Sequence, residues 1–335
     1  MDLQKTQHFT TRANQICNGL VDFIPANVKL VEPFVGEGDL LSLFPNHQWE
    51  KYDIDPRCED VIKQDTLTVP PSYAEKWVIT NPPYLAKNKA KDGKKIFDQY
   101  KVDDLYKAAM LSILDAEGGI LIIPSNFFTD ERTGAVRKSF LSTFDIYAIN
   151  FFTSPVFEST TYSVCSFAFG RKKAHTTTQS VLANIYPEQE HQILVLEEKY
   201  DYRVAGEFYH ALKLEPVKFE RLTTAPIGNK YILNLKLFAL DTRTERIRLE
   251  YCTEHFVGKA TDRSYATLVS EIPYTEEQQK YIANEFNKQL EDFRRAFGNL
   301  SLTNYRDYNR KRIGFVMAYQ LASKVAREMM ESEDV

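Results

Sequence analysis

The sequence predicts an α/β protein whose first half forms a mostly parallel sheet covered by helices on both sides. Short apolar segments alternate with helical patterns between residue 28 and about residue 170. One helical pattern, residues 103–116, places Leu105, Ala108 and Leu111 on one broad face and offers Asp103 or Asp104 as an N-terminal cap. Alternation of this kind is typical of strands that lie parallel in one sheet with helices packed on both faces.

Six segments of the first half have the composition of strands: residues 28–34, 49–55, 77–80, 118–125, 145–152 and 162–170. The polar stretch 171–180 then interrupts the pattern and is the best candidate for a domain boundary. Beyond it, residues 231–240 and 246–252 are expected to be strands, and residues 275–298 and 319–330 helices. We therefore expect a first domain over residues 1–172 and a second, mixed α+β domain over residues 173–335.

Composition excludes several classes of protein. The net charge is −4, so contact with a nucleic acid would have to come from local basic patches rather than from the whole molecule. The four cysteines are far apart and include no paired spacing, which predicts neither a disulfide framework nor a metal site. No apolar run is long enough to span a membrane, and the first residues lack the core of a secretory signal, so a cytoplasmic location is expected.

Residues that could bind a ligand or take part in catalysis follow successive predicted strands. Gly36 and Gly38 follow the first strand and allow a tight turn close to a ligand. Asp53 ends the second strand, where an acidic side chain typically accepts hydrogen bonds from ribose hydroxyls. Asp65 and Asn81 follow the next two strands, and the prolines after Asn81 end its strand abruptly. Because ligands bind at the carboxyl ends of parallel strands, these residues predict a groove of the size of a nucleoside.

The order of these motifs resembles that of the amino-methyltransferases that act on adenine in DNA. The matching segments are QHFTT (7–11), EPFVGEGDL, YDID, QDT, NPPY, GGILIIPSNFF and SPVFESTTYSVCSFAFGRK, which together cover about the first 172 residues. Their order is the gamma arrangement, in which the cofactor motifs precede the catalytic motif and a target-recognition domain ends the chain. The resemblance implies a Rossmann-like class I methyltransferase sheet and S-adenosylmethionine as the cofactor.

The resemblance also assigns residues to the cofactor. The methionine end would lie near Thr10, Thr11 and Glu32, although Arg12 stands where the family often has a proline. Asp53 would hold the ribose and Asp65 the amino group of the cofactor's adenine. The full set of residues expected around the cofactor is Thr10, Thr11, Glu32, Pro33, Phe34, Gly36, Gly38, Asp53, Ile54, Asp65, Thr66, Asn81 and Pro83.

The catalytic motif can be explained by the chemistry of its residues. An adenine amino group is a poor nucleophile because its lone pair is delocalised into the ring. The side-chain oxygen of Asn81 and the carbonyl of Pro82 can both accept hydrogen bonds from this amino group and favour a pyramidal nitrogen. Tyr84 would stack on the target base, which a duplex must first flip out, and the resemblance places Phe157 on a second side of that base. Without the motif, Phe157 would be assigned to core packing.

Double-stranded DNA is the expected partner, together with a cognate restriction endonuclease that would act separately on the same site. Two basic stretches could contact the DNA, although a solvated charged face is the ordinary explanation of each. The candidate contacts are Lys87, Lys89, Lys91, Arg306, Tyr308, Arg310, Lys311 and Arg312.

Three alternatives share the first domain. Adenine in RNA and glutamine in proteins also present a planar conjugated amino group, so the motif alone does not separate these substrates from DNA. The glutamine enzymes usually place the substrate domain before the glycine turn, whereas only about thirty residues precede it here. A catalytically inactive module that only binds nucleic acid is the third alternative. The sequence therefore favours a site-specific DNA adenine methyltransferase, the modification enzyme of a restriction and modification pair, with RNA as the main alternative.

Overall fold

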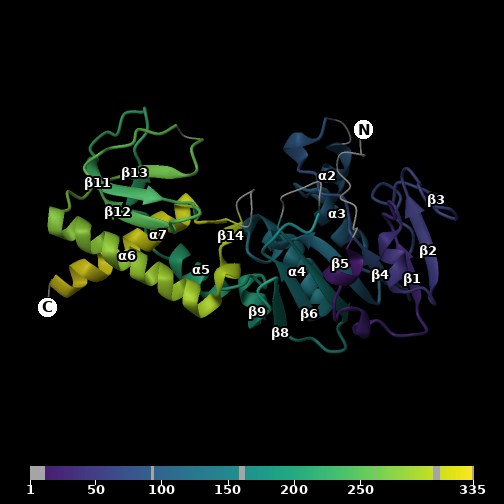
Figure 1. Cartoon of the computed structure of the whole chain (residues 1–335). Helices are drawn as coiled ribbons and strands as arrows, with labels where there is room; N and C mark the ends of the chain where they lie inside the picture. The colour runs from purple at the N-terminus through teal and green to yellow at the C-terminus, as the bar shows by residue number, and fades with distance from the viewer. Residues whose placement is uncertain (1–11, 92–93, 158–162, 260, 305–309, 334–335) are drawn as a thin grey trace. The chain divides into compact units, whose positions relative to one another are not determined.

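The computed structural model describes residues 12–91, 94–157, 163–259, 261–304 and 310–333 (Figure 1). The chain forms two compact units. Unit 1 comprises residues 1–203 and 306–309, and unit 2 comprises residues 204–305 and 310–335.

Unit 1 is built on a nine-stranded sheet with the order β3-β2-β1-β4-β5-β7-β6-β8-β9. Strands β3, β2, β1, β4 and β5 lie parallel to one another. The next strand, β7, is antiparallel to both β5 and β6. β8 is parallel to β6, and β9 is antiparallel to β8 and ends the sheet. The strands are β1 (Lys29–Glu32), β2 (Gln48–Asp53), β3 (Ile62–Lys63), β4 (Trp77–Thr80), β5 (Gly118–Pro124), β6 (Phe144–Phe152), β7 (Val164–Arg171), β8 (Thr178–Tyr186) and β9 (Glu190–Glu197).

Helical segments cover both faces of this sheet, as the sequence predicted. Phe140 of α4 packs against the rings of Phe167 and Phe169 on one face. Ser166, which points to the opposite face, donates a hydrogen bond to the carbonyl of Ile16 in α1 at 2.5 Å. The α-helices of unit 1 are α1 (Ala13–Ile16), α2 (Lys94–Tyr100), α3 (Leu105–Ser112) and α4 (Gly134–Thr143). Single turns of 3₁₀-helix occur at η2 (Val21–Phe23), η3 (Asp39–Leu43), η4 (Lys87–Lys89), η5 (Ser125–Phe128), η6 (Glu131–Thr133) and η7 (Glu198–Tyr200).

The division between the units differs from the predicted boundary after residue 172. The polar stretch 171–180 only connects β7 to β8, and β8 and β9 continue the sheet of unit 1 by pairing beside β6. The compact units separate after Arg203 instead. Polar composition marks a surface connection, but it does not tell whether the next strand joins the old sheet or starts a new one.

Unit 2 packs a four-stranded antiparallel sheet, with the order β10-β13-β11-β12, against two long helices that lie side by side (Figure 1). The first of these helices begins at a capping box, in which Thr275 and Gln278 exchange side-chain to backbone hydrogen bonds. The two strands and two helices predicted for this half are all present. The elements are α5 (Gly206–Lys213), β10 (Phe219–Arg221), β11 (Tyr231–Phe238), β12 (Arg248–Tyr251), β13 (Tyr265–Ser270), α6 (Glu276–Phe297), η8 (Asn299–Ser301), β14 (Thr303–Asn304), β15 (Lys311–Arg312) and α7 (Phe315–Glu333).

None of the helices in the described parts of the chain is both long enough and apolar enough to cross a membrane.

Candidate active site

Three neighbouring parallel strands bring the predicted site residues to one edge of the sheet. β1 lies between β2 and β4, with Val31 opposite Val78. Glu32 and Asp53 are the last residues of β1 and β2, and Asn81 follows the last residue of β4. Parallel strands end at the same edge, so the fold brings these three residues to one edge of the sheet.

The turn after β1 is held by the acid at the end of β2. Gly36 and Gly38 have φ angles of +57° and +84°, which favour glycine. The amide of Gly36 donates to Asp53 Oδ2 at 2.8 Å, and the amide of Asp55 donates to Oδ1 at 2.8 Å. A side chain at Gly38 would place its Cβ 3.1 Å from the sulfur of Cys58. Asp53 therefore fixes the turn.

Glu32 is a buried acid that lies beside this turn. Its side chain is almost fully buried, and Oε1 accepts hydrogen bonds from Thr80 at 2.5 Å and from the amide of Phe34 at 3.1 Å. Within the described residues, Oε2 is buried without a hydrogen-bond partner. Burial raises the pKa of Glu32 to about 8, against the two hydrogen bonds that lower it, and the charge of Asp53 raises it further. A buried oxygen without a donor is what a site for a cationic or hydrogen-bonding ligand would leave.

Asp65 and Thr66 are engaged locally. The carboxylate of Asp65 accepts from the amides of Leu67 and Thr68, at 3.2 and 3.3 Å, and from the Thr68 hydroxyl at 2.6 Å. Thr66 is buried, and its hydroxyl donates to the carbonyl of Pro33 at 3.0 Å, which ties the loop after β3 to the loop after β1. Asp65 thus shapes the turn in which it lies.

Asn81 and Tyr84 contact each other directly. The Tyr84 hydroxyl lies 2.5 Å from Asn81 Oδ1 and 2.7 Å from the carbonyl oxygen of Ile122, and its single proton is available to either acceptor. Its ring is 7% exposed and meets Tyr106 edge to face at 6.3 Å. Burial raises the pKa of Tyr84 well above its ordinary value, so the hydroxyl keeps its proton. Stacking of this ring on a base would require the ring to leave its present position.

The other residues expected around the cofactor and the target base differ in their exposure. Pro33, Pro82 and Pro83 are buried, and Phe34 and Ile54 are half-buried. Phe157 is 3% exposed, which equally fits a role in core packing. Thr10 and Thr11 lie outside the described residues.

The candidate DNA contacts fall into two groups. In unit 1, Lys89 and Lys91 are exposed, while Lys87 pairs with Asp98 at 2.5 Å. In unit 2, Lys311 is 4% exposed, and its ammonium donates to Asn304 Oδ1 at 2.5 Å. Burial, together with the charge of Arg294, lowers the pKa of Lys311 to about 7. A phosphate contact by this lysine would therefore require the β14–β15 hairpin to rearrange. Arg310 and Arg312 are half-buried, and Arg306 and Tyr308 lie outside the described residues.

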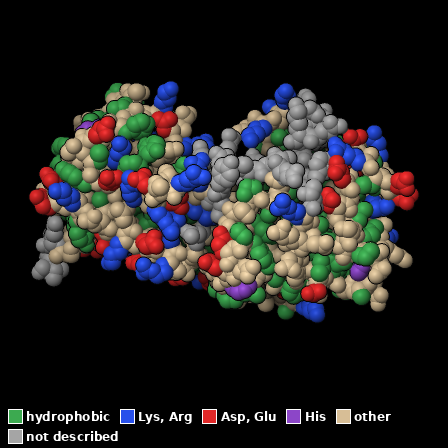
Figure 2. Space-filling model, in the orientation of Figure 1, with side chains coloured by type: hydrophobic (Ala, Val, Ile, Leu, Met, Phe, Trp, Pro, Cys, Tyr) green, Lys and Arg blue, Asp and Glu red, His purple; other side chains and the backbone are tan. Residues whose placement is uncertain are grey.

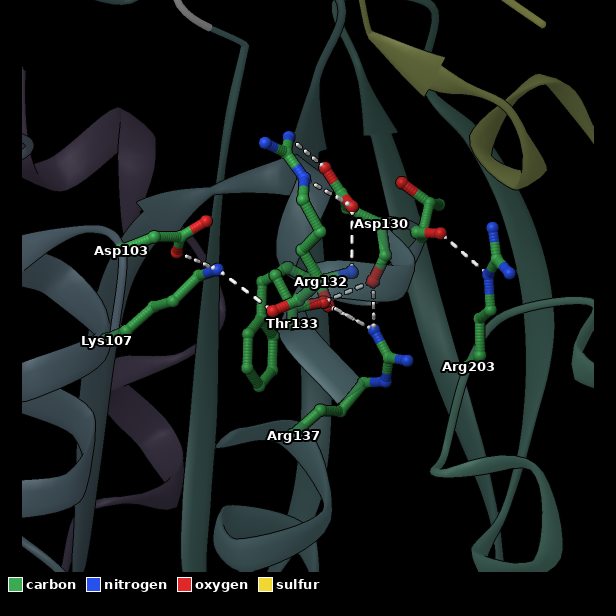
Figure 3. A network of polar contacts seen from close by, with 9 residues as sticks. Asp103, Lys107, Asp130, Arg132, Thr133, Arg137 and Arg203 are labelled. Atoms are coloured by element: carbon green, nitrogen blue, oxygen red, sulfur yellow. Dashed lines mark hydrogen bonds and ion pairs between the residues drawn. The ribbon is translucent and has the colours of Figure 1, made fainter. Parts of the chain in front are cut away.

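Several polar residues near the site were missed by the sequence analysis. Thr80 donates a hydrogen bond to Glu32, and the buried side chains of Lys107 and Arg137 belong to the polar network in Figure 3. The i to i+4 spacing of Asp103 and Lys107 was a visible signal for that ion pair. Arg137 gave no such signal, because its acceptors are carbonyl oxygens and the Thr133 hydroxyl.

Charged side chains of both signs are mixed over both units on the face of the molecule that Figure 2 draws. Among the described residues no group of His, Cys, Asp and Glu could hold a metal ion.

The sheet is mostly parallel, with a glycine turn after its first strand, an acid after its second and an Asn-Pro-Pro-Tyr motif after β4. This is the class I methyltransferase fold. The model of the N-6 DNA Methylase family matches residues 47–225, which is just over half of the chain. The chain belongs to this family. Among curated proteins, none matches the sequence.

Solved structures that resemble the chain include three modification proteins. A candidate modification subunit of a type I restriction enzyme from Vibrio vulnificus YJ016 is 13% identical, with a TM-score of 0.44, and the match covers 62% of this chain and 52% of that one. The M protein of the type I restriction enzyme EcoKI is 14% identical, with a TM-score of 0.42 and coverages of 53% and 48%. The methyltransferase subunit of a type I restriction-modification system from Streptococcus thermophilus is 15% identical, with a TM-score of 0.40 and coverages of 54% and 47%. The chain thus spans about half of the length of each.

Proposed function

We propose that the protein is an S-adenosylmethionine-dependent methyltransferase that modifies the exocyclic amino group of adenine in double-stranded DNA. The observation that carries this proposal is the position of Asn81. It follows a buried strand at the edge where the glycine turn and two buried acids lie, in a chain of the N-6 DNA methylase family. A side-chain amide at this position can accept hydrogen bonds without removing a proton from the substrate.

The residues at the strand ends fit the proposed cofactor. The turn at Gly36 and Gly38 lets the backbone approach a ligand closely, and Asp53 stands at the end of β2, where an acid typically accepts hydrogen bonds from ribose hydroxyls. Glu32 offers a buried oxygen that has no hydrogen-bond donor among the described residues. When bound, S-adenosylmethionine would supply an electrophilic methyl group on a sulfonium. The residues of this chain would position the acceptor.

Asn81 would act by orienting the acceptor amine. Its Oδ1 and the Pro82 carbonyl would accept hydrogen bonds from the amino group and direct the nitrogen lone pair away from the adenine ring. The extra proton of the product would leave after the attack, so no carboxylate base is required.

A base in a duplex reaches this edge only after it has been flipped out, at a cost of a few kcal/mol. Tyr84 and Phe157 are proposed to stack on the flipped base and to offset this cost. Lys89 and Lys91 are proposed to contact the DNA backbone from the segment after the motif, because both are exposed. Unit 2 is proposed to recognise the target sequence, and a cognate endonuclease is proposed to act on the same site.

The test is to incubate the protein with labelled S-adenosylmethionine and, separately, unmethylated duplex DNA, transfer RNA or a protein extract. Methyladenine in the duplex alone is the expected product, identified by mass spectrometry. Label in transfer RNA or in protein glutamine would overturn the proposed substrate.

Substitution of the catalytic amide tests the mechanism separately. The Asn81→Ala variant should lose about a hundredfold or more in kcat, as when a positioned hydrogen-bonding group is removed, with cofactor and DNA affinity retained. Asn184→Ala is the matched control, because Asn184 lies on β8, four strands from β4 in the order of the sheet. Unchanged methylation by Asn81→Ala would refute the role of Asn81.

A further inference from the structure

The segment that follows the Asn-Pro-Pro-Tyr motif is held against the start of α3. The amide of Leu85 donates to Asp104 Oδ1 at 3.1 Å, and the amide of Lys87 donates to the carbonyl of Asp103 at 2.8 Å. The amide of Leu105 returns a hydrogen bond to the carbonyl of Leu85 at 3.1 Å. Residues 85–87 therefore run antiparallel to residues 103–105, and the position of the second segment sets that of the first.

Lys107 holds this second segment from inside the protein. It is 4% exposed, and its ammonium donates to Asp103 Oδ1 at 2.5 Å and to the carbonyl of Arg132 at 3.2 Å (Figure 3). A buried ammonium is tolerated only when its charge is paired and its protons are donated. Lys107 thus connects the start of α3 to η6, the turn that precedes α4.

Arg137 continues the connection on the other side of η6. Its side chain is 1% exposed, and Nη1 donates to the carbonyl of Phe127 at 2.6 Å and to the Thr133 hydroxyl at 2.7 Å. Its Nε donates to the carbonyl of Asp201 at 2.6 Å. Close by, Arg203 Nε donates to the carbonyl of Thr129 at 2.7 Å. The network in Figure 3 therefore extends from Asp103 to Arg203, after which the chain leaves unit 1. The hydrogen bonds between residues 85–87 and residues 103–105 connect it to the motif segment.

We propose that Lys107 and Arg137 are positioning residues. Through the network they hold the segment after the Asn-Pro-Pro-Tyr motif at a fixed position relative to residues 201–203. Neither side chain touches the reacting atoms, so neither is a catalytic residue. Their effect is to keep residues 85–87 fixed against α3. The position of Tyr84 and of the basic residues 87–91 then depends on contacts made at η6 and at the end of unit 1. The expected effect on methylation rests on the proposed function, whereas the expected effect on the backbone does not.

The first experiment measures the backbone directly, by amide hydrogen exchange in the full chain. In Lys107→Met, the amides of Leu85 and Lys87 should exchange about tenfold faster or more, because their acceptors are no longer held by a charged hydrogen bond. Lys76→Met is the matched control, because Lys76 forms an ion pair with Glu50 next to the other end of β4. Unchanged exchange at residues 85–87 in Lys107→Met would overturn the proposal.

The second experiment tests whether the two residues act together. The Arg137→Met variant should also accelerate exchange at residues 85–87, whereas Arg171→Met should not. Arg171 likewise donates to carbonyl oxygens, those of Leu114 and Ala116, but it lies outside this network. In the double variant of Lys107 and Arg137 the acceleration should be smaller than the product of the two single effects, as for residues in one network. A purely multiplicative result would show that they act independently and would overturn the proposal.

Methylation kinetics separate this inference from the proposed function. If duplex DNA is the substrate, Lys107→Met should lower kcat about tenfold, in proportion to the loss of order, and leave the affinity for S-adenosylmethionine unchanged. A parallel loss of cofactor affinity would indicate general damage to unit 1 and would contradict positioning. Absence of DNA methylation by the wild-type protein would refute the proposed function alone, because the exchange experiment would still decide the role of the network.

Discussion

The Glu32→Gln substitution should remove a pH dependence from the binding of S-adenosylmethionine. Burial raises the pKa of Glu32 to about 8, so the acid is largely protonated at neutral pH in the free protein. In the proposed complex the cofactor's ammonium group lies near this carboxyl. The ionised form attracts an ammonium ion, whereas the protonated form does not. Cofactor binding should therefore be accompanied by release of a proton.

The size of the effect follows from the fraction of molecules that is ionised. With a pKa of about 8, about one molecule in a hundred carries the carboxylate at pH 6 and about half carry it at pH 8. If only this form binds tightly, the apparent affinity should rise about fiftyfold over this range. Glutamine does not titrate, so the variant should lack this rise. Any titration of the cofactor itself is common to both proteins and cancels in the comparison.

The assay is calorimetric titration of the wild-type protein and the variant at pH 6, 7 and 8. Glu50→Gln is the matched control. Although partial burial opposes it, hydrogen bonds from Lys29 and Lys76 lower the pKa of Glu50 to about 2, so Glu50 stays ionised throughout. The same pH slope in the wild-type protein and in Glu32→Gln would refute the reasoning.

The same pKa predicts how the stability of the ligand-free protein depends on pH. The folded state binds the proton of Glu32 more tightly than the unfolded chain does, because the pKa of the Glu32 carboxyl is 4.5 when the chain is unfolded. The contribution of Glu32 to the free energy of unfolding is therefore fully present below pH 4.5 and is lost as the pH rises towards 8. Denaturant titrations of the wild-type protein and Glu32→Gln over this range should differ in this slope.

Three further substitutions test local features of the fold. Gly38→Ala should lower the free energy of unfolding by about 1 kcal/mol, measured by urea denaturation, because its φ of +84° favours glycine and its Cβ would crowd Cys58. Gly119→Ala should prevent the folding of unit 1, since its Cβ would lie 1.8 Å from the carbonyl oxygen of Val78, and the circular dichroism spectrum should report the loss. Thr275→Ala should cost about 1 kcal/mol through loss of the α6 cap, and Thr275→Ser should restore most of it in the same denaturation assay.

The strands that carry the site were predictable because each ends in a recognisable signal. The prolines after Asn81 stop β4, and the glycine turn follows β1 within a few residues. The edge strands β8 and β9 could not be placed from sequence in the same way. An alternating strand gives the same pattern whether it pairs with an existing sheet or begins another, and only the tertiary contacts with β6 decide this.

Which strand ends meet at the candidate site was predictable, but the contacts between their side chains were not. The placement of Glu32, Asp53 and Asn81 at one edge follows from the parallel order of the strands. The hydrogen bond between Tyr84 and Asn81 does not, because it depends on which way a ring turns after two prolines. The buried Arg137 was unpredictable for a similar reason, since most of its partners are backbone carbonyls, which no residue type marks in the sequence.

The edge strand β9 has a consequence for the behaviour of the protein at high concentration. An exposed edge offers unpaired backbone groups to any other strand, and its exposed Ile193 and Val195 would favour such pairing. If β9 strands from two molecules paired antiparallel over their full length, however, Glu190 of each would lie opposite Glu197 of the other. Like charges at both ends would oppose this pairing, offset in part by Lys199, which forms an ion pair with Glu197 at 3.0 Å.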